Sequence, residues 1–151
     1  MKKIALLLPF ILLSVISFAQ FVARAEIKEK IDGLCDNKNV YVLLEMLGDQ
    51  KEAVCAVKNA EIEKMLADSV TFLKDKGDYK DKGIVSMVIN CKGEVVQCKI
   101  DNKTKSEALD EQIVKVFKSL TSFKAGKLNG KNVDSMKLWG FDIVDGKIKI
   151  N

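Results

Sequence analysis

The chain has no histidine and only one proline among its 151 residues. Without histidine it cannot build a Ser–His or Cys–His catalytic arrangement, or a zinc site that uses imidazole ligands. A single proline also excludes a proline-rich spacer. Hydrophobic residues make up 48% of the chain and charged residues 30%, which is typical of a globular domain and not of a disordered chain.

The N-terminus has the pattern of a secretory signal peptide. Two lysines precede an apolar run over residues 4–16, and small residues follow it. Cleavage is predicted after Ala19, with Ala25 as a second option. The apolar run is shorter than the roughly 20 residues that span a bilayer, so an uncleaved anchor is the weaker alternative. We therefore expect residues 20–151 to be periplasmic or secreted, without a stable membrane anchor.

The charge of the exported part argues against a nucleic-acid binder. Residues 1–19 hold two of the 25 basic residues and none of the 21 acidic ones, so their removal lowers the net charge from +4 to +2. The basic face of a nucleic-acid-binding protein normally dominates its charge. We therefore expect no nucleic-acid partner.

All four cysteines lie in the part that is expected to be exported. An even number of cysteines in an oxidising compartment predicts up to two disulfides, with three pairings open. No C-x-x-C pair is present, so a thioredoxin-like motif is excluded, and closely spaced ligand pairs for a metal are missing too. We expect no metal site. The disulfide candidates are Cys35, Cys55, Cys91 and Cys98.

The hairpin expected around Gly93 limits the disulfide pairing. With a two-residue loop ending at Gly93, Cys91 and Cys98 lie two diagonal steps apart on the paired strands. Their Cα atoms are then beyond the roughly 7 Å limit for a disulfide. Each of the two is therefore expected to pair with Cys35 or Cys55, which ties the N-terminal region to the hairpin.

Hydrophobic periodicity predicts an α+β fold. Amphipathic spacing predicts helices, and β-branched or alternating runs predict strands. Asn59 is the expected N-cap of the second helix, and a helical interpretation of 40–47 stays open. Turns are expected at Asn129-Gly130 and Asp145-Gly146. The predicted helices cover 26–34, 60–74 and 109–120, and the predicted strands cover 40–44, 53–57, 84–89, 94–100, 134–144 and 147–150.

The order of these elements predicts an antiparallel sheet with helices packed on one face. Strand, strand, helix and strand follow one another in the C-terminal half. We divide the chain into a signal peptide over 1–19, an N-terminal helix and strand segment over 20–58, and a C-terminal domain over 59–151.

The C-terminal half also carries a series of segments in a recognisable order between Gly83 and Gly146. They are a Gly-led strand (GIVSMVIN), a tight turn (CKGEV), an outgoing strand (VQCKI), a helix opening with Leu-Asp (ALDEQIVKVF), the run FKAGKLNGKNV and a strand ending in an aromatic residue (LWGFDI). In this order they resemble the TonB C-terminal domain family. The resemblance implies a strand–strand–helix–strand unit that pairs an extended partner segment with an exposed strand edge. The partner that it implies is a protein or a peptide, with an outer-membrane component as one option.

The chain also departs from the family. Lys124 stands where the family often has proline. An energy-transducing TonB protein has a membrane anchor with a histidine-bearing motif and a long proline-rich spacer. This chain has no histidine, and its one proline, Pro9, lies in the predicted signal peptide. We expect a stand-alone exported domain without proton-motive coupling.

The expected function is a non-enzymatic binding module, with no catalytic residues and no cofactor. Pairing at a strand edge uses main-chain hydrogen bonds and needs no special side chains. The expected partner-binding residues lie on the long strand over 134–144, and the aromatic ones also fit a sheet face packed on the helices. They are Met136, Leu138, Trp139 and Phe141.

Two other functions stay open. One is a small periplasmic enzyme, such as a thiol-redox protein that uses Cys91 or Cys98. The other is a self-associating structural protein of the envelope, for example a homodimer. The acidic pair Asp110-Glu111 is interpreted as solvated surface, because adjacent helix residues do not face each other.

Overall fold

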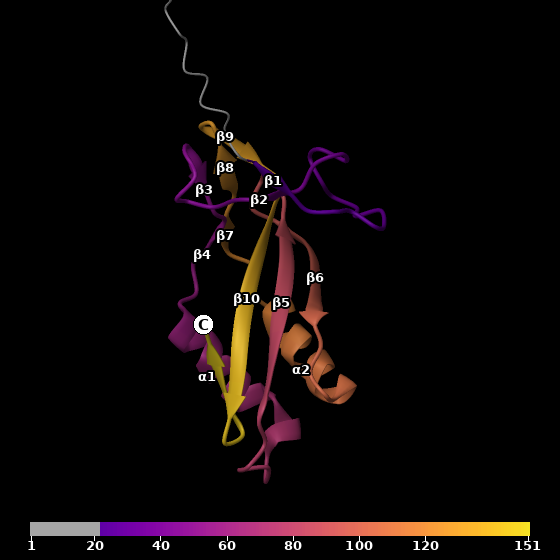
Figure 1. Ribbon diagram of the computed structural model, residues 1–151, viewed down its shortest axis with the longest axis vertical. Helices are drawn as coiled ribbons and strands as arrows, with labels where there is room; N and C mark the ends of the chain where they lie inside the picture. Colours follow the sequence, from indigo (N-terminus) through magenta and orange to yellow (C-terminus); the bar gives the residue numbers. More distant parts are fainter. Residues whose placement is uncertain (1–21) are drawn as a thin grey trace, which may run out of the picture.

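Two long antiparallel strands form the centre of the computed structural model, which describes residues 22–151 (Figure 1). The predicted signal peptide lies outside the described residues. Strand β10 (Ser135–Val144) pairs along its length with β5 (Asp81–Ile89), and β5 pairs on its other side with β6 (Val95–Asn102). The sheet order is β1-β2-β10-β5-β6, with β11 also beside β10. The outer strands are β1 (Ala23–Arg24), β2 (Tyr41–Val42) and β11 (Lys147–Ile150).

Two small sheets join the N-terminal part to the segment after the second helix. One contains β3 (Gln50–Lys51), β8 (Gly126–Leu128) and β9 (Lys131–Val133), and the other contains β4 (Val54–Cys55) and β7 (Phe123–Lys124). The turn predicted at Asn129-Gly130 is confirmed. Both residues have positive φ, 51° and 76°, as a two-residue hairpin loop between β8 and β9 requires.

Helix α1 (Asn59–Ser69) and helix α2 (Glu107–Lys118) confirm two of the predicted helices. A short 3₁₀ turn, η1 (Thr71–Leu73), follows α1 where the sequence predicted a continuous helix to 74. Val70 between them is extended, and its N–H closes the last turn on the Leu66 carbonyl. The prediction that Asn59 caps α1 is wrong, because the N-cap is Lys58 and it makes no side-chain capping bond.

Both helices pack on one face of the sheet, which confirms the predicted α+β class. The odd-numbered side chains of β10 and β5 enter this core, and the ring of Trp139 lies edge-on to Phe117 at 5.6 Å between centroids. The alternation of a half-buried strand explains why Trp139 and Phe141 face the helices while Met136 and Leu138 face the other way. The largest fully buried side chains include Phe117, Phe141, Ile62, Leu66, Met87, Ile89, Leu109, Ile113, Leu120 and Ile143.

The opposite face of the sheet is covered at one end by residues 22–43, here called the N-terminal segment (Figure 1). The helix predicted over 26–34 is wrong, since no helical residue is found there. Ile31 instead packs in a small cluster with Val40 and Val88, and the chain turns back at Gly33, whose φ is +89°. A Cβ on Gly33 would lie 2.9 Å from the Val96 side chain, so the close approach also requires glycine.

The C-terminal strand β11 is held to α1 by Glu63. One carboxylate oxygen of Glu63 accepts a bond from the Ile150 N–H at 3.0 Å, and the other accepts a bond from Lys149 Nζ at 3.2 Å. The Ile150 N–H is the main cause that lowers the pKa of Glu63 below its ordinary value of 4.5, and Lys149 adds to it. This contribution to stability is therefore present above pH 4.5 and is lost as the pH falls through the lower, folded-state pKa.

We expect the amide chemical shift of Ile150, followed by NMR, to titrate with a midpoint below 4.5 and to lose this titration in Glu63→Gln. The matched control is Glu61→Gln on the same helix, which leaves the titration unchanged because Glu61 is exposed and away from β11. An Ile150 titration that persists in Glu63→Gln contradicts this docking of β11.

Candidate functional site

Two short strands of the same chain cover most of the edge of β10 that faces away from β5. β2 runs parallel to the first residues of β10 and pairs Tyr41 with Ser135. β11 runs antiparallel to the last residues, from Phe141 to Val144. Next to β11, the Asn151 N–H donates to the Gly140 carbonyl at 3.0 Å. The edge is therefore covered at both ends.

Between the covered ends, the main chain of Leu138 is uncovered. Every second residue of a strand points its N–H and C=O to the same edge. Asp134 and Gly140 both accept bonds at this edge, from the N–H groups of Tyr41 (2.9 Å) and Asn151 (3.0 Å). Leu138 is separated from both by an even number of positions, so its N–H and C=O point to this same edge. Within residues 22–151 its only strand partner is Ser86, which lies on β5 at the other edge of β10. Leu138 thus offers one free donor and one free acceptor, and its side chain is 47% exposed.

A hollow of about 620 Å³ lies beside this uncovered stretch. Its walls come from β10 and from the chain between β2 and α1, which Figure 1 shows on the same side of β10. Residues far apart in the sequence thus meet at this edge. The lining residues are Leu44, Glu45, Met46, Glu52, Ala53, Val54, Cys55, Val57, Lys58, Asn59, Lys137 and Trp139.

The side chains around the hollow combine exposed apolar surface with one ion pair. Met46 is 87% exposed and Val54 is 52% exposed, which is unusual for large apolar residues close together. Lys137 Nζ lies 2.7 Å from Glu52 and 5.3 Å from the centre of the Trp139 ring. The hollow therefore suits an apolar side chain that is carried by a segment bonded to Leu138.

The structure corrects one premise of the predicted partner-binding set, that its strand edge is open. Met136 pairs with Val42 of β2, and Phe141 pairs with Ile150 of β11. The side chains of Trp139 and Phe141 are 4% and 1% exposed, because they belong to the core under the helices. Of the four residues, only Leu138 has both an exposed side chain and free main-chain groups.

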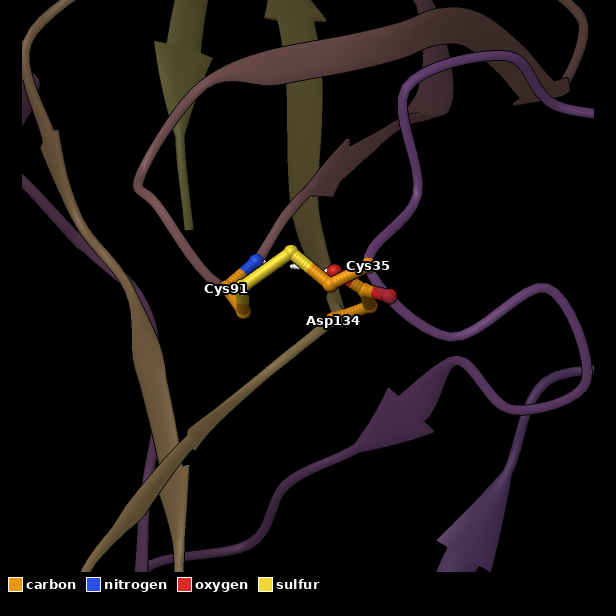
Figure 2. Close-up of side chains that lie close together, drawn as sticks. All are labelled: Cys35, Cys91 and Asp134. Atoms are coloured by element: carbon orange, nitrogen blue, oxygen red, sulfur yellow. Dashed lines mark hydrogen bonds between the residues drawn. A yellow bond between two sulfur atoms is a disulfide. The ribbon is translucent and has the colours of Figure 1, made fainter.

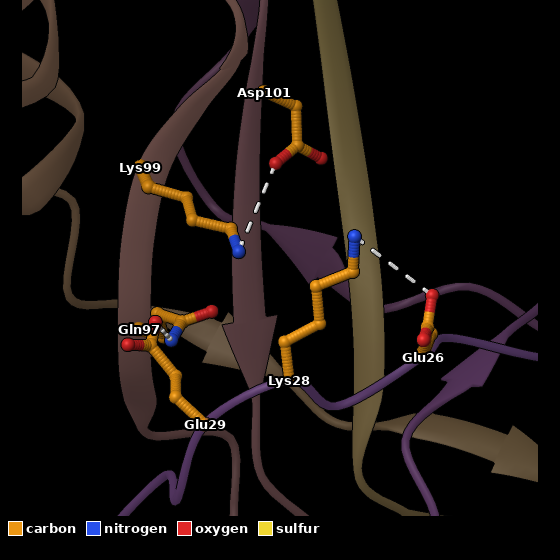
Figure 3. Close-up of polar contacts among 6 residues, drawn as sticks. All are labelled: Glu26, Lys28, Glu29, Gln97, Lys99 and Asp101. Atoms are coloured by element: carbon orange, nitrogen blue, oxygen red, sulfur yellow. Dashed lines mark hydrogen bonds and ion pairs between the residues drawn. The ribbon is translucent and has the colours of Figure 1, made fainter.

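The outer edge of β6 is the other long edge of the sheet, and it is poorly suited to pairing. Its register with β5 is broken twice, between Ile84 and Val85 and between Val88 and Ile89. Its exposed side chains include Lys99 and Asp101, which form an ion pair at 3.9 Å (Figure 3). Bulges and charges on an edge strand discourage pairing with another chain. The uncovered stretch of β10 is therefore the better candidate site.

A disulfide and a buried carboxylate fasten the N-terminal segment next to this edge (Figure 2). Cys35 and Cys91 are bonded, with their Cα atoms 6.0 Å apart, which confirms the predicted tie between the N-terminal region and the hairpin. The carboxylate of Asp134 accepts bonds from the N–H groups of Cys91 (2.8 Å) and Asp36 (2.6 Å). Asp134 is 2% exposed and lies just before β10.

Cys55 and Cys98 are free, so the structure contains one of the two disulfides that the cysteine count allows. Cys98 lies opposite Met87, as the hairpin register predicted, and it is buried under the helices. Burial raises the pKa of the Cys98 thiol to about 11, with a small opposing effect from Lys118. Cys98 is therefore a protonated core residue, and a neutral thiol is a poor nucleophile.

Two acidic residues have structural roles that the sequence did not indicate. The sequence pattern places Asp134 only in a strand, and it indicates a solvated surface position for Asp110. Asp110 is 6% exposed and accepts a bond from the Thr104 N–H at 3.0 Å, so that interpretation is wrong. Asp134 accepts bonds from main-chain N–H groups far away in the sequence, and Asp110 accepts one from the loop before its helix. No local sequence pattern indicates either contact.

Comparisons with protein families, curated proteins and solved structures found no match to this chain. Within residues 22–151, neither helix has the length and the apolar character that crossing a membrane requires. The geometry of the site is therefore the main basis for assigning a function.

The burial of the cysteines predicts the outcome of a thiol titration on the native, unreduced protein. We expect one rapidly reacting thiol, the half-buried Cys55, at a pH well below the Cys98 pKa of about 11. Cys98 should react only after denaturation. In the control variant Cys55→Ser, no rapid reaction should remain. Two rapid thiols in the native protein would contradict the burial of Cys98.

Proposed function

We propose that the protein is an exported, non-enzymatic binding module that captures an extended peptide or protein segment in the cell envelope. The observation that carries this proposal is the free main chain of Leu138 beside the hollow at the edge of β10. A strand edge with unpaired N–H and C=O groups binds extended segments through main-chain hydrogen bonds, and a neighbouring pocket adds side-chain selectivity.

The proposed contact is short. A partner residue in extended conformation accepts from the Leu138 N–H and donates to the Leu138 carbonyl. A neighbouring apolar side chain of the partner enters the hollow next to Val54 and Trp139. Because β2 and β11 cover β10 on both sides of Leu138, the partner pairs with a few residues and then leaves the sheet.

The resemblance to the TonB C-terminal domain family supports this assignment. Strands β5 and β6, helix α2 and strand β10 follow one another in the order that the resemblance implies. β10 is then the strand whose edge receives the partner. The cover that β2 and β11 provide distinguishes this chain from a domain with a fully exposed edge.

Export is supported by the disulfide, since such bonds persist in oxidising compartments. It agrees with the signal peptide predicted over residues 1–19. The alternative of a thiol-redox enzyme has less support, because Cys91 is held in the disulfide and Cys98 is buried and protonated.

The proposal is tested by removing one main-chain donor. In Leu138→Pro the N–H that points to the open edge is lost, while the bonds to β5 stay, since proline is tolerated on a strand where the N–H faces solvent. We expect this variant to lose capture of a partner from envelope extract, because one of the two bonds is gone and the ring fills the edge. Thermal unfolding checks that the variant is folded.

The matched control is Leu138→Ala, which shortens the side chain and keeps the main chain. This variant should capture the same partner. In both the alanine variant and the unmodified protein, the bound partner should slow hydrogen exchange of the main-chain amide at position 138. Equal capture by Leu138→Pro, or no specific capture by the unmodified protein, contradicts the proposed function.

A further inference from the structure

The N-terminal segment is attached to the rest of the protein by few contacts of its own. Its strands β1 and β2 are each two residues long. Most of its apolar contacts form a cluster separate from the main core, around Ile31, Val40 and Val88, and Leu43 is buried apart from this cluster, beside Gly126. This cluster is much smaller than the core under the helices, so apolar burial alone holds the segment weakly.

The polar side chains of the segment add little to this attachment (Figure 3). Lys28 pairs with Glu26 of the same segment at 3.9 Å, and Lys99 pairs with Asp101 of the same strand. The one contact among the drawn residues that crosses to β6 is the bond from Gln97 to Glu29, at 3.2 Å and exposed. Exposed polar pairs contribute little to stability.

The Cys35–Cys91 disulfide, Asp134 and the bond from the buried Asn90 Nδ2 to the Gly33 carbonyl at 2.9 Å therefore carry much of the attachment. The covalent bond joins residues 56 positions apart in the sequence, and the Asp134 carboxylate accepts bonds from the N–H groups of Asp36 and Cys91, on the two sides of the disulfide. Cys35 is an exposed residue, and Cys91 is half-buried.

The part of the segment next to β10 hides main-chain groups of the candidate site. The Tyr41 N–H bonds to the Asp134 carbonyl, and Val42 pairs with Met136. Asp134, Met136 and Leu138 are alternate residues of one strand, so their main-chain groups point to the same edge. Without β2, the single free position at Leu138 becomes a continuous edge of three positions.

Docking of the N-terminal segment also has an energetic cost near the Ser135 hydroxyl. Leu43 is 2% exposed, and its Cδ1 lies beside Gly126 together with the Ser135 hydroxyl. The Ser135 hydroxyl is buried and has no hydrogen-bond partner within the described residues. Burial of an unpaired hydroxyl is unfavourable, so the docked arrangement carries this cost next to Leu43.

We propose that the edge of β10 from Asp134 to Leu138 is a concealed docking surface that reduction of the Cys35–Cys91 disulfide uncovers for an extended apolar segment. This inference rests on the proposed function and adds its regulation and its larger surface. The partner takes the place of β2, so it runs parallel to β10. It carries two aliphatic residues three positions apart, as Val40 and Leu43 are, because Val40 packs with Val88 of β5 and Leu43 lies beside Gly126.

The reduction step requires a dithiol donor. Its thiolate attacks the sulfur of Cys35, a mixed disulfide forms, and Cys91 leaves as a thiolate. The second thiol of the donor then closes the donor's own disulfide and releases Cys35. Two electrons pass to the protein, and the two protons of the donor end on the sulfurs of Cys35 and Cys91.

Hydrogen exchange of the full protein with and without a dithiol reductant tests the uncovering. We expect the amides of Met136 and of the N-terminal segment to exchange at least about tenfold faster after reduction, while those of β5 and α2 keep their rates. The double variant Cys35→Ser, Cys91→Ser should behave like the reduced protein. The control Cys55→Ser, Cys98→Ser should respond to reductant like the unmodified protein.

A labelled peptide with the sequence of residues 39–44 then tests the surface itself by fluorescence anisotropy. The host is Tyr41→Pro, which lacks the N–H that bonds Asp134 and so undocks the competing strand. We expect the reduced Tyr41→Pro protein to bind the peptide at least about tenfold more tightly than the oxidised, unmodified protein.

Three results overturn the inference. Unchanged exchange at Met136 after reduction shows that the disulfide does not hold β2. Faster exchange throughout β5 and α2 shows that the disulfide holds the whole fold. Faster local exchange without peptide binding shows that the uncovered edge is not a docking surface. None of these measurements depends on capture by Leu138 alone, so they are separate from the test of the proposed function.

Discussion

The carboxylate of Asp134 is the constraint on which the arrangement of the N-terminal segment depends. It lies buried just before β10 and accepts hydrogen bonds from the N–H groups of Asp36 and Cys91, which lie on the two sides of the disulfide. Its own carbonyl accepts the bond that sets β2 beside β10. One residue thus fixes the hairpin turn, the N-terminal segment and the covered part of the sheet edge relative to one another.

The covered edge leaves little of β10 free to pair with another chain. A long open strand edge is a template for aggregation, and proteins protect such edges with short strands, charges or bulges. Here β2 and β11 protect the two ends of β10, and bulges and charges protect β6. Leu138 remains as a small opening beside the hollow, and in the proposed function this limits pairing to a partner that also fits the hollow.

The C-terminal half was predictable because its elements are long and periodic. The α2 helix, the hairpin at Asn129-Gly130 and the alternation along β10 all follow from local patterns, and the structure confirms them. The N-terminal segment was not predictable. Its apolar residues have helical spacing, yet the disulfide, Gly33 and contacts with Val96 hold it without a helix. The bond from the Asp36 N–H to Asp134 joins residues 98 positions apart, and the pairing of β2 with β10 is similarly distant in the sequence, so local patterns do not record either contact.

The most direct test of this account is the free energy of unfolding of Asp134→Asn with the disulfide intact, combined with exchange of the Asp36 and Cys91 amides. The asparagine side chain keeps the size of aspartate but supplies one acceptor oxygen in place of two. The account predicts a loss of about 1–3 kcal/mol and faster exchange of one of the two amides. Unchanged stability with both amides still protected would contradict the central role of this carboxylate.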